Sequence, residues 1–521
     1  MSAADTNPTG PDRTTTSPTG NHDQAASRPG PTRTAISRRP LLAALALAPV
    51  AGAAGVRAGT GTPVVGTPAA GTPMAGTPTA GTPAAGAPGG WPLYGHDLSG
   101  NKAATGSGLS VDTVAGLELA WSVEVGGAVS ATPVIANGVA IFGSYDGNLY
   151  AVDLLTGEEV WTYETGVAVL ERNLQIDLGI VGSAAAVDGV VYVGDAAANL
   201  HAVDAATGEE IWTVLVDEQP NACIWSSPVV WEGTVYVGVA SIAKEVGFRG
   251  GVVAVDAVSG EVLWHTFMVP EGRDGAGVFS VPAIDPDRGM VFVGTQNAYT
   301  ENPAPYGDTI SIVALQASSG EIVWTYAAPP NDGETAPVED VGLSASPHLF
   351  SVEIDGEMRD LVGEGQKSGV YWALDRDSGE VVWESQISPA GFLGGMEGTS
   401  AYADGIVAVP ATDWPEFDGP ATGMVTALDA TTGEPIWTAL QDAPAASPVG
   451  IADGIVFHAG LDGILHAYDL TTGDELWSYD LGGSASGGVA IANGVVVVGA
   501  ATPLFAPFIR PGNTVQAFAL P

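Results

Sequence analysis

A unit reading Ala-x-Asp-x-x-Thr-Gly-Glu-x-x-Trp recurs along this 521-residue chain and constrains its fold more than any other feature. Alternating apolar residues lead into each copy as in a β-strand, the Asp can bond the backbone of a turn, and the Gly can take the positive φ that such a turn needs. A second strand begins near the Glu and carries the Trp. Seven copies, the fourth with Gln316 in place of the Asp, lie at Ala151–Trp161, Ala202–Trp212, Ala254–Trp264, Ala314–Trp324, Ala373–Trp383, Ala427–Trp437 and Ala467–Trp477.

An eighth copy is divided between the two ends of this region. Trp121 has no Ala-x-Asp before it, and Val515–Ala519 has no Trp after it, so together they complete one unit. Upstream of each copy lies a second hairpin, such as PVIANGVAIFG, in most cases with an Asn-Gly or Asp-Gly turn. Two hairpins make a four-stranded sheet, and closure into a ring removes exposed sheet edges. The sequence therefore predicts an all-β fold, an eight-bladed β-propeller closed by pairing of its N- and C-terminal strands, with the repeated Trp packed between neighbouring sheets.

Three segments of different composition divide the chain. Residues 1–54 combine a polar stretch, which we expect to be disordered, with Arg38-Arg39 and an apolar run ending near Val50, a pattern typical of a twin-arginine signal. Residues 55–90 repeat Gly-Thr-Pro as a linker, and residues 91–521 form the propeller. We expect export by the twin-arginine route to a periplasmic, cell-wall-associated or secreted location, with no stable membrane span in the mature chain. An uncleaved anchor or a chance Arg pair is the alternative.

Charge and cysteine content exclude several classes of function. The net charge is -43, and residues 91–521 hold 56 acidic residues (59 − 3) against 10 basic ones (16 − 6). Such a surface repels nucleic acid and anionic lipid, so neither is an expected partner. Cys223 is the single cysteine, which excludes an internal disulfide and a CxxCH haem-attachment site in this sequence.

The spacing of the repeated tryptophans places the insertions in the middle blades. Successive tryptophans are 40 residues apart at both ends of the repeat array and up to 60 apart in its middle. Insertions in a propeller fall in loops on one face, where a binding site is normally built.

The repeat resembles the pyrroloquinoline quinone (PQQ) enzyme repeat from about residue 91 to the end. Trp91–Asp97, reading WPLYGHD, and Gly365–Gly369, reading GQKSG, are similar to segments of quinoprotein alcohol dehydrogenases. The likeness is greatest to the polyvinyl-alcohol-dehydrogenase-like branch without its cytochrome c module. This resemblance implies a propeller of quinoprotein type that oxidises an alcohol or polyol by hydride transfer to a calcium-polarised quinone and passes electrons to a separate acceptor such as a cytochrome c.

Five residues carry the site that this resemblance implies. Glu245, in EVGFRG, and Asn297, in GTQN, are similar to the family's calcium ligands. Phe279 stands where the family usually has a Trp under the quinone. Asp340 resembles the catalytic Asp, and Lys367 resembles the Lys or Arg that bonds the reactive quinone oxygen. The resemblance also makes Gln366 and Arg249 cofactor-binding residues.

These residue types suit the chemistry on their own terms. A hard cation prefers carboxylate and amide oxygens, and that cation with a lysine would polarise a carbonyl. An aromatic ring can support a planar cofactor, and a carboxylate can accept the alcohol proton.

Structural roles remain open for the same residues. Glu245 and Arg249 could form an exposed ion pair, Asn297 could sit in a turn, and Lys367 could relieve acidic repulsion. Asp332 rivals Asp340 as the acid.

Departures from the family pattern keep two further readings open. The family's adjacent cysteine pair is missing, and Gly394–Thr399 matches its GGxEWG segment without the Trp. The alternatives to an enzyme are therefore a non-catalytic propeller acting as an extracytoplasmic scaffold or binding module, and a degenerate enzyme that binds quinone without turnover. Convergence of Glu245, Asn297, Asp340 and Lys367 at one mouth of the channel would favour the enzyme, whereas scattering would favour the scaffold.

Overall fold

The structure is a computed structural model that describes residues 90–166, 168–169, 177–241, 247–298, 309–329, 341–390, 394–414, 420–500, 502 and 509–521. The predicted signal and linker, and the site residues Glu245 and Asp340 with the rival Asp332, lie outside these ranges. Within them the chain is built of β-strands, with one 3-10 turn, η1 (Val114–Gly116), as its only helical element. In these ranges no helix is both long and apolar enough to cross a membrane.

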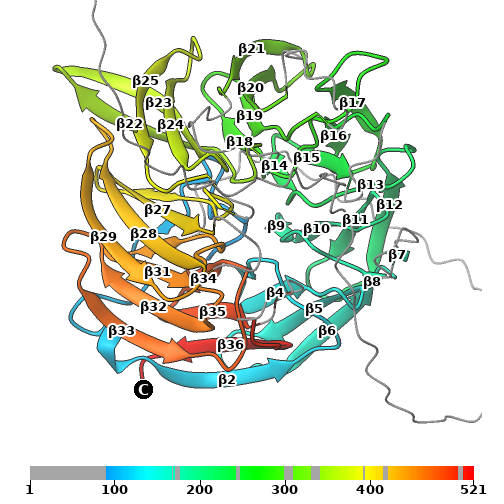
Figure 1. The fold of residues 1–521 in the computed structure, drawn as a ribbon. Coiled ribbons are helices and arrows are strands. Elements are labelled where there is room, and N and C mark those ends of the chain that lie inside the picture. The colour runs from blue at the N-terminus through cyan, green and yellow to red at the C-terminus, as the bar shows by residue number, and fades with distance from the viewer. Residues whose placement is uncertain are drawn as a thin grey trace, which may run out of the picture. The chain divides into compact units, whose positions relative to one another are not determined.

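Eight four-stranded antiparallel sheets are arranged in a ring (Figure 1), which confirms the predicted eight-bladed propeller. The strands of each blade are given from the innermost outward. Blade 1 consists of β3 (Val134–Ala136), β4 (Val139–Gly143), β5 (Asn148–Asp153) and β6 (Glu159–Glu164), and blade 2 of β9 (Ala185–Val187), β10 (Val190–Gly194), β11 (Asn199–Asp204) and β12 (Glu210–Leu215). Blade 3 consists of β14 (Val229–Trp231), β15 (Thr234–Ser241), β16 (Gly251–Asp256) and β17 (Val262–Phe267), and blade 4 of β18 (Ala283–Asp285), β19 (Met290–Gly294), β20 (Ser311–Gln316) and β21 (Ile322–Ala327). Blade 5 consists of β22 (His348–Ile354), β23 (Glu357–Gly365), β24 (Val370–Asp375) and β25 (Val381–Gln386), and blade 6 of β26 (Ala401–Ala403), β27 (Ile406–Asp413), β28 (Thr422–Asp429) and β29 (Pro435–Gln441). Blade 7 consists of β30 (Gly450–Ala452), β31 (Ile455–Ala459), β32 (Ile464–Asp469) and β33 (Glu475–Asp480), and blade 8 of β34 (Val489–Ala492), β35 (Val495–Ala500), β36 (Thr514–Ala519) and β2 (Glu118–Glu124). Short strands outside this pattern are β1 (Ala103–Ala104), β7 (Ala168–Val169), β8 (Asp177–Leu178) and β13 (Ala222–Cys223).

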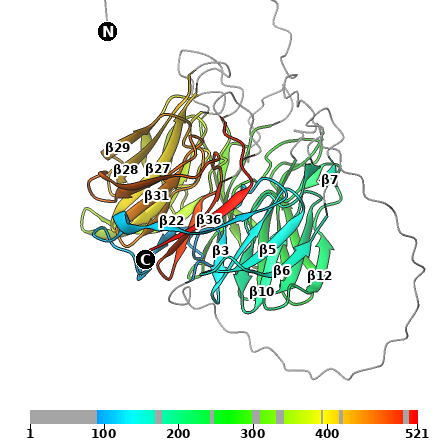
Figure 2. The same ribbon diagram turned by 90° about the horizontal axis from the view of Figure 1, so that it is seen from below.

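The ring closes where the two ends of the propeller meet. β2 pairs antiparallel with β36, with Trp121 opposite Ala517, so the eighth blade has three C-terminal strands and one N-terminal strand. The cyan β2 lies beside the red β36 in Figure 1, and the two strands meet again in the view of Figure 2. The split eighth repeat read from the sequence is therefore confirmed.

Two faces follow from this connectivity. The turn face carries the hairpin turns between the first and second strands and between the third and fourth strands of each blade. The loop face carries the connections between the second and third strands and those that lead to the next blade. All of the long insertions fall on the loop face, since the turns on the other face hold only a few residues in every blade.

On the turn face, seven of the eight repeated Trp side chains, from Trp121 to Trp437, contact the turn of the next blade. The indole N–H of Trp161 donates to the Ala205 carbonyl at 2.9 Å, and that of Trp212 donates to the Ala257 carbonyl at 3.1 Å. The Gly of the next turn lies flat on the same ring: a methyl group on Gly208, whose φ is +73°, would come within 2.9 Å of Trp161. The repeat therefore keeps the Gly and the Trp together because each Gly supplies both a left-handed turn and the surface against which the preceding Trp packs.

Residues 91–107, which we call the N-terminal girdle, run along the innermost strands. Trp91 is fully buried, and the girdle bonds blade after blade through its backbone in sequence order. The bonded pairs are Trp91 with Ile135, Pro92 with Ala186, Leu98 with Ile284, Ser99 with Leu349, Asn101 with Tyr402, Lys102 with Ile451 and Ser107 with Gly494. These pairs reach blades 1, 2 and 4 to 8, so the WPLYGHD motif has a structural role in tying the ring together.

Candidate functional site

Equivalent residues of successive blades form a ring at the loop-face end of the channel. Each lies three positions before the residue, often proline, that precedes the innermost strand. Because the blades repeat, these positions come to one level around the channel, and we call them the mouth ring. Its members in blades 1 to 6 are Ser130, Val181, Trp225, Phe279, Ser344 and Glu397.

An aromatic pair occupies one side of the mouth ring. The ring centroids of Trp225 and Phe279 are 5.4 Å apart with their planes tilted by 53°, and both side chains are half-buried. Phe279 was identified from the sequence, whereas Trp225 was missed. Its position before Pro228 matches that of Phe279 before Pro282, and this spacing was the available signal.

Amide groups of blade 4 meet the segment that enters blade 5. The Gln296 Nε2 donates to Ser344 Oγ of the mouth ring at 2.7 Å. A methyl group on Gly342 would collide with Gln296 Oε1 and would lie 2.9 Å from Asn297 Oδ1. Gly342 is therefore needed where both amides approach the backbone, and the Asn297 oxygen is held at this point, two residues beyond Asp340.

The adjacent Gln366 and Lys367 hold the same segment from the other side. Gln366 is fully buried, and its Nε2 donates to the Val341 carbonyl at 2.8 Å. Its Oε1 accepts hydrogen bonds from Trp372 Nε1 at 3.0 Å and from Ser368 Oγ at 2.8 Å. The Lys367 backbone N–H donates to the Gly342 carbonyl at 3.1 Å. These bonds engage the Gln366 amide with protein groups and favour a supporting role for it, so its predicted contact with a cofactor stays a prediction.

The Lys367 ammonium forms an ion pair with the mouth ring. Its Nζ lies 3.0 Å from Glu397 Oε1, and the two side chains are 11% and 23% exposed. An ammonium and a carboxylate at this distance and burial make a charge-assisted hydrogen bond. Lys367, Ser344 and the aromatic pair therefore belong to neighbouring parts of one mouth.

Arg249 lies at the outer edge of blade 3. Its Nε donates to the Val269 carbonyl at 2.9 Å, and its guanidinium carbon is 4.0 Å from the centroid of the Phe267 ring, at the end of the outermost strand β17. Its backbone N–H and carbonyl both bond the Gln219 amide at 2.9 Å. These contacts fix the loop that leads into β16 and favour a structural role, so the assignment of Arg249 to a cofactor also stays a prediction.

A buried acid close to the site faces a different direction. Glu364 lies on β23 three residues before Lys367, is fully buried, and has no hydrogen-bond partner for either oxygen among the described residues. Its Oε1 is packed so closely on Gly294 of blade 4 that a methyl group there would collide with it. Burial raises the pKa of the Glu364 carboxyl well above its usual value. Burial therefore favours the neutral form of this side chain, in a place where equivalent strands carry Phe142, Val193 and Val293.

The described part of the mouth fits a planar quinone. Trp225 and Phe279 offer apolar ring surface, Lys367 offers an ammonium for an electron-poor carbonyl, and Asn297 offers an amide oxygen suited to a hard cation. Gln296 and Gln366, through their bonds to Ser344 and Val341, hold these groups in place.

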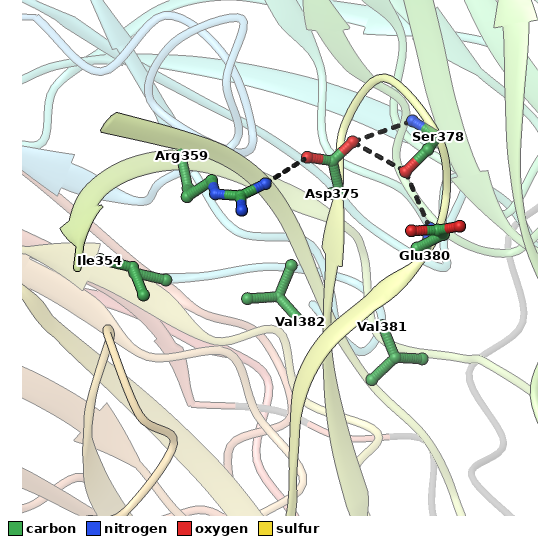
Figure 3. A pocket seen from close by; sticks show the side chains of 7 residues that line it. All are labelled: Ile354, Arg359, Asp375, Ser378, Glu380, Val381 and Val382. Atoms are coloured by element: carbon green, nitrogen blue, oxygen red, sulfur yellow. Dashed lines mark hydrogen bonds and ion pairs between the residues drawn. The ribbon is translucent and has the colours of Figure 1, made fainter. Parts of the chain in front are cut away.

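A groove of about 430 Å³ lies elsewhere, on the turn face of blade 5 (Figure 3). Ile354, Val381 and Val382 line it beside Arg359, whose NH1 is 3.8 Å from Asp375 Oδ2. Asp375 ends the six-residue strand β24, which begins just after Lys367, so a rise of about 3.3 Å per residue separates the groove from the mouth by about 20 Å. The groove is not part of the candidate site.

Comparison with known proteins places the chain in a family. Residues 91–392, more than half of the chain, match the family described as "Glucose/ethanol/alcohol dehydrogenase, beta-propeller domain", and residues 421–519 match "Outer membrane protein assembly factor BamB". Polyvinylalcohol dehydrogenase from Pseudomonas sp is 28% identical over 353 residues, covering 61% of this chain and 54% of that protein. Quinohemoprotein alcohol dehydrogenase from Comamonas testosteroni is 27% identical over 389 residues, covering 64% and 54%. The chain thus spans about half the length of these relatives.

Solved structures show the same fold. The crystal structure of the Comamonas testosteroni quinohemoprotein alcohol dehydrogenase superposes with a TM-score of 0.70 at 22% identity, covering 83% of this chain and 80% of that one. BamB from Moraxella catarrhalis gives a TM-score of 0.53 at 16% identity, covering 77% and 99%. The family match, the eightfold sheet repeat and the relatives agree: this chain belongs to the PQQ β-propeller family of glucose, ethanol and alcohol dehydrogenases.

Proposed function

We propose that this protein is a PQQ-dependent dehydrogenase that oxidises an alcohol or polyol outside the cytoplasm. The observation that carries the proposal is the grouping at one mouth of the channel. The Phe279–Trp225 pair, the Asn297 amide and Lys367 come from blades 3 to 5. The Asn297 amide and the Lys367 backbone N–H both meet Gly342, in the segment that follows Asp340. A scaffold needs no such combination of ring surface, oxygen ligand and cation.

Each residue has a separate role in this proposal. Phe279 and Trp225 support one face of the cofactor, and Lys367 donates a hydrogen bond to its reactive carbonyl oxygen. Asn297 and Glu245 hold a calcium ion. When bound, the quinone supplies the hydride acceptor that amino-acid side chains lack. Asp340 accepts the hydroxyl proton of the substrate as a general base.

The remaining partners are inferred from composition. The single cysteine leaves no CxxCH in this sequence, so we propose a separate electron acceptor such as a cytochrome c. The Arg38-Arg39 segment supports export through the twin-arginine route. The excess of acidic residues excludes nucleic acid as a partner in this proposal.

The test mixes the purified full chain with PQQ and calcium, records the absorbance of bound quinone, and then adds a panel of alcohols and polyols with a dye acceptor. We expect a bound-quinone spectrum and dye reduction. Lys367→Ala and Asp340→Asn should each lower the rate of dye reduction by about 10²-fold or more, since each removes a group that acts in the transition state.

A matched variant controls for the loss of positive charge. Arg359 lies on the same blade but on the turn face, with its side chain 48% exposed, so Arg359→Ala should leave the rate unchanged. Quinone binding without dye reduction for any alcohol would indicate the degenerate enzyme. Absence of quinone binding at tens of micromolar would exclude the dehydrogenase and leave the scaffold, which the match of residues 421–519 to BamB favours as the second candidate.

A further inference from the structure

We propose that Glu397 is the positioning residue of Lys367: its carboxylate fixes the ammonium at the mouth ring in the orientation that a ligand carbonyl would meet. The inference rests on the proposed function for the identity of that ligand. The ion pair itself is a property of the chain alone, because Nζ and Oε1 are 3.0 Å apart without any ligand.

The backbone around the pair is built for close approach. A methyl group on Gly395, whose φ is +75°, would collide with the backbone of Lys367. The Met396 N–H donates to the Gln366 carbonyl at 3.2 Å, and Gly395 bonds Thr412 of β27 through both its N–H and its carbonyl, at 3.0 and 2.9 Å. The loop that carries Glu397 is thus fastened to the Lys367 loop on one side and to blade 6 on the other. Gly395 is required because no side chain fits between them.

The ion pair restricts the position of the Lys367 ammonium. A lysine side chain is a point charge on a flexible four-carbon stem, which loses rotamer entropy when it is fixed. A carboxylate that is itself only 23% exposed can fix this stem, because a largely desolvated ion pair is screened less than one in water. An ammonium has three donors, so a bond to Glu397 still allows Lys367 to donate to a ligand.

Glu364, the acid three residues before Lys367, does not take this role. The Glu364 carboxyl packs against Gly294 between blades 4 and 5, and its raised pKa keeps it neutral over a wider range of pH. Glu397 instead enters from the connection between blades 5 and 6 and contacts the ammonium directly.

The first test measures Lys367 directly. The chain has three lysines, Lys102, Lys244 and Lys367, so the full chain labelled with [13Cε]lysine should give three NMR signals, and Lys367→Arg assigns the one of interest. Without any cofactor, Glu397→Gln should lower the pKa of Lys367, because an opposite charge within hydrogen-bond distance favours the ammonium. Glu397→Asp should restore part of that shift.

A matched control lies on the outer strand of the same blade. Glu384 is exposed on β25, and Glu384→Gln removes the same charge without contacting Lys367, so the Lys367 titration should not move. An unchanged Lys367 titration in Glu397→Gln would overturn the inference, whatever the protein does with quinone.

The second test is kinetic and depends on the proposed function. In the dehydrogenase assay, Glu397→Gln should lower kcat by about tenfold with little change in KM for the alcohol, and the alkaline limb of kcat should move to lower pH with the Lys367 titration. If the Lys367 titration moves while the wild-type chain binds no quinone, the ion pair stands and the proposed dehydrogenase fails. A lower kcat with an unmoved alkaline limb would contradict the positioning role.

Discussion

The two faces of this propeller share the same strands but differ in how their connections hold together. On the turn face, blades 1 to 7 repeat a short left-handed turn, with a Gly lying on the Trp of the preceding blade, as Gly208 lies on Trp161. On the loop face, each connection is different, and polar groups such as Lys367 and Glu397 pair with one another across blades. The turn face therefore repeats one stabilising contact from blade to blade, whereas the polar contacts of the loop face each occur once.

The difference explains how one ring can hold a specialised site. Because neighbouring blades are joined by apolar packing and by indole hydrogen bonds near the turn face, a loop on the other face can lengthen or change sequence without opening the ring. The N-terminal girdle adds backbone bonds to seven of the eight blades and strengthens this separation.

The largest expected effect on stability comes from removing a Trp between blades. Trp383 is 8% exposed, donates from Nε1 to the Ala430 carbonyl at 3.0 Å and stacks on Tyr371 with centroids 5.5 Å apart. Trp383→Ala should lower the free energy of unfolding by about 3–5 kcal/mol, through lost burial and the cavity that remains. Urea unfolding followed by fluorescence and circular dichroism would measure it.

The same variant tests whether the two faces are independent. At a temperature where Trp383→Ala is folded, we expect its quinone affinity to equal that of the wild type. Lys367→Ala should show the opposite pattern, with an unchanged unfolding midpoint and a loss of activity. Leu440→Ala, at a side chain that is 78% exposed, is the control for loss of a large apolar group. A parallel loss of quinone binding in Trp383→Ala would show that the faces are coupled.

The sequence predicted the turn face almost completely because its signals are local. A turn Asp, a left-handed Gly and a Trp occur within one short unit, and their partners are the same unit in the next blade. The closure of the ring by β2 and β36 followed from the same repeat, since its incomplete copies could only complete each other.

The candidate site was predicted in part because its contacts are not local. The family resemblance predicted Phe279, Asn297 and Lys367 as site residues, and their roles stay predictions. The resemblance did not reveal Trp225 or the Lys367–Glu397 pair, because each contact joins residues that are distant in the sequence and that only the fold brings together. Gln366 has a residue type suited to binding a ligand, but in the fold its amide bonds the Val341 carbonyl and the Trp372 indole.

The second prediction concerns Glu364, where the pattern of the repeat is broken inside the protein. Its pKa is raised in the folded state, so the acid is more easily ionised in the unfolded chain. The folded state then has its full stability below the unfolded pKa of about 4.3, and stability falls by about 1.4 kcal/mol per pH unit as pH rises toward the folded pKa. Glu364→Val, which copies Val293 of blade 4, should remove this slope and raise the unfolding midpoint at neutral pH.

The control for this prediction is an exposed carboxylate of the same blade. Glu384→Val should change the pH dependence of unfolding very little, because an exposed acid keeps nearly the same environment on unfolding. Equal slopes for the wild type and Glu364→Val between pH 4 and pH 8 would show that Glu364 is not a buried neutral acid.

The smallest expected effect separates the two reasons for glycine on the turn face. Gly189 and Gly208 lie in the two turns of blade 2, with φ of +81° and +73°, but a methyl group would meet nothing within 4 Å at Gly189 and the Trp161 ring at 2.9 Å at Gly208. Gly189→Ala should therefore cost only the left-handed backbone term of about 1 kcal/mol. Gly208→Ala should cost about 1–3 kcal/mol more, because the ring must move to admit the methyl group. Urea midpoints of the two variants measured side by side would decide it: equal costs would mean that the turn Gly serves backbone geometry alone, and that the contact between Gly and Trp does not hold neighbouring blades together.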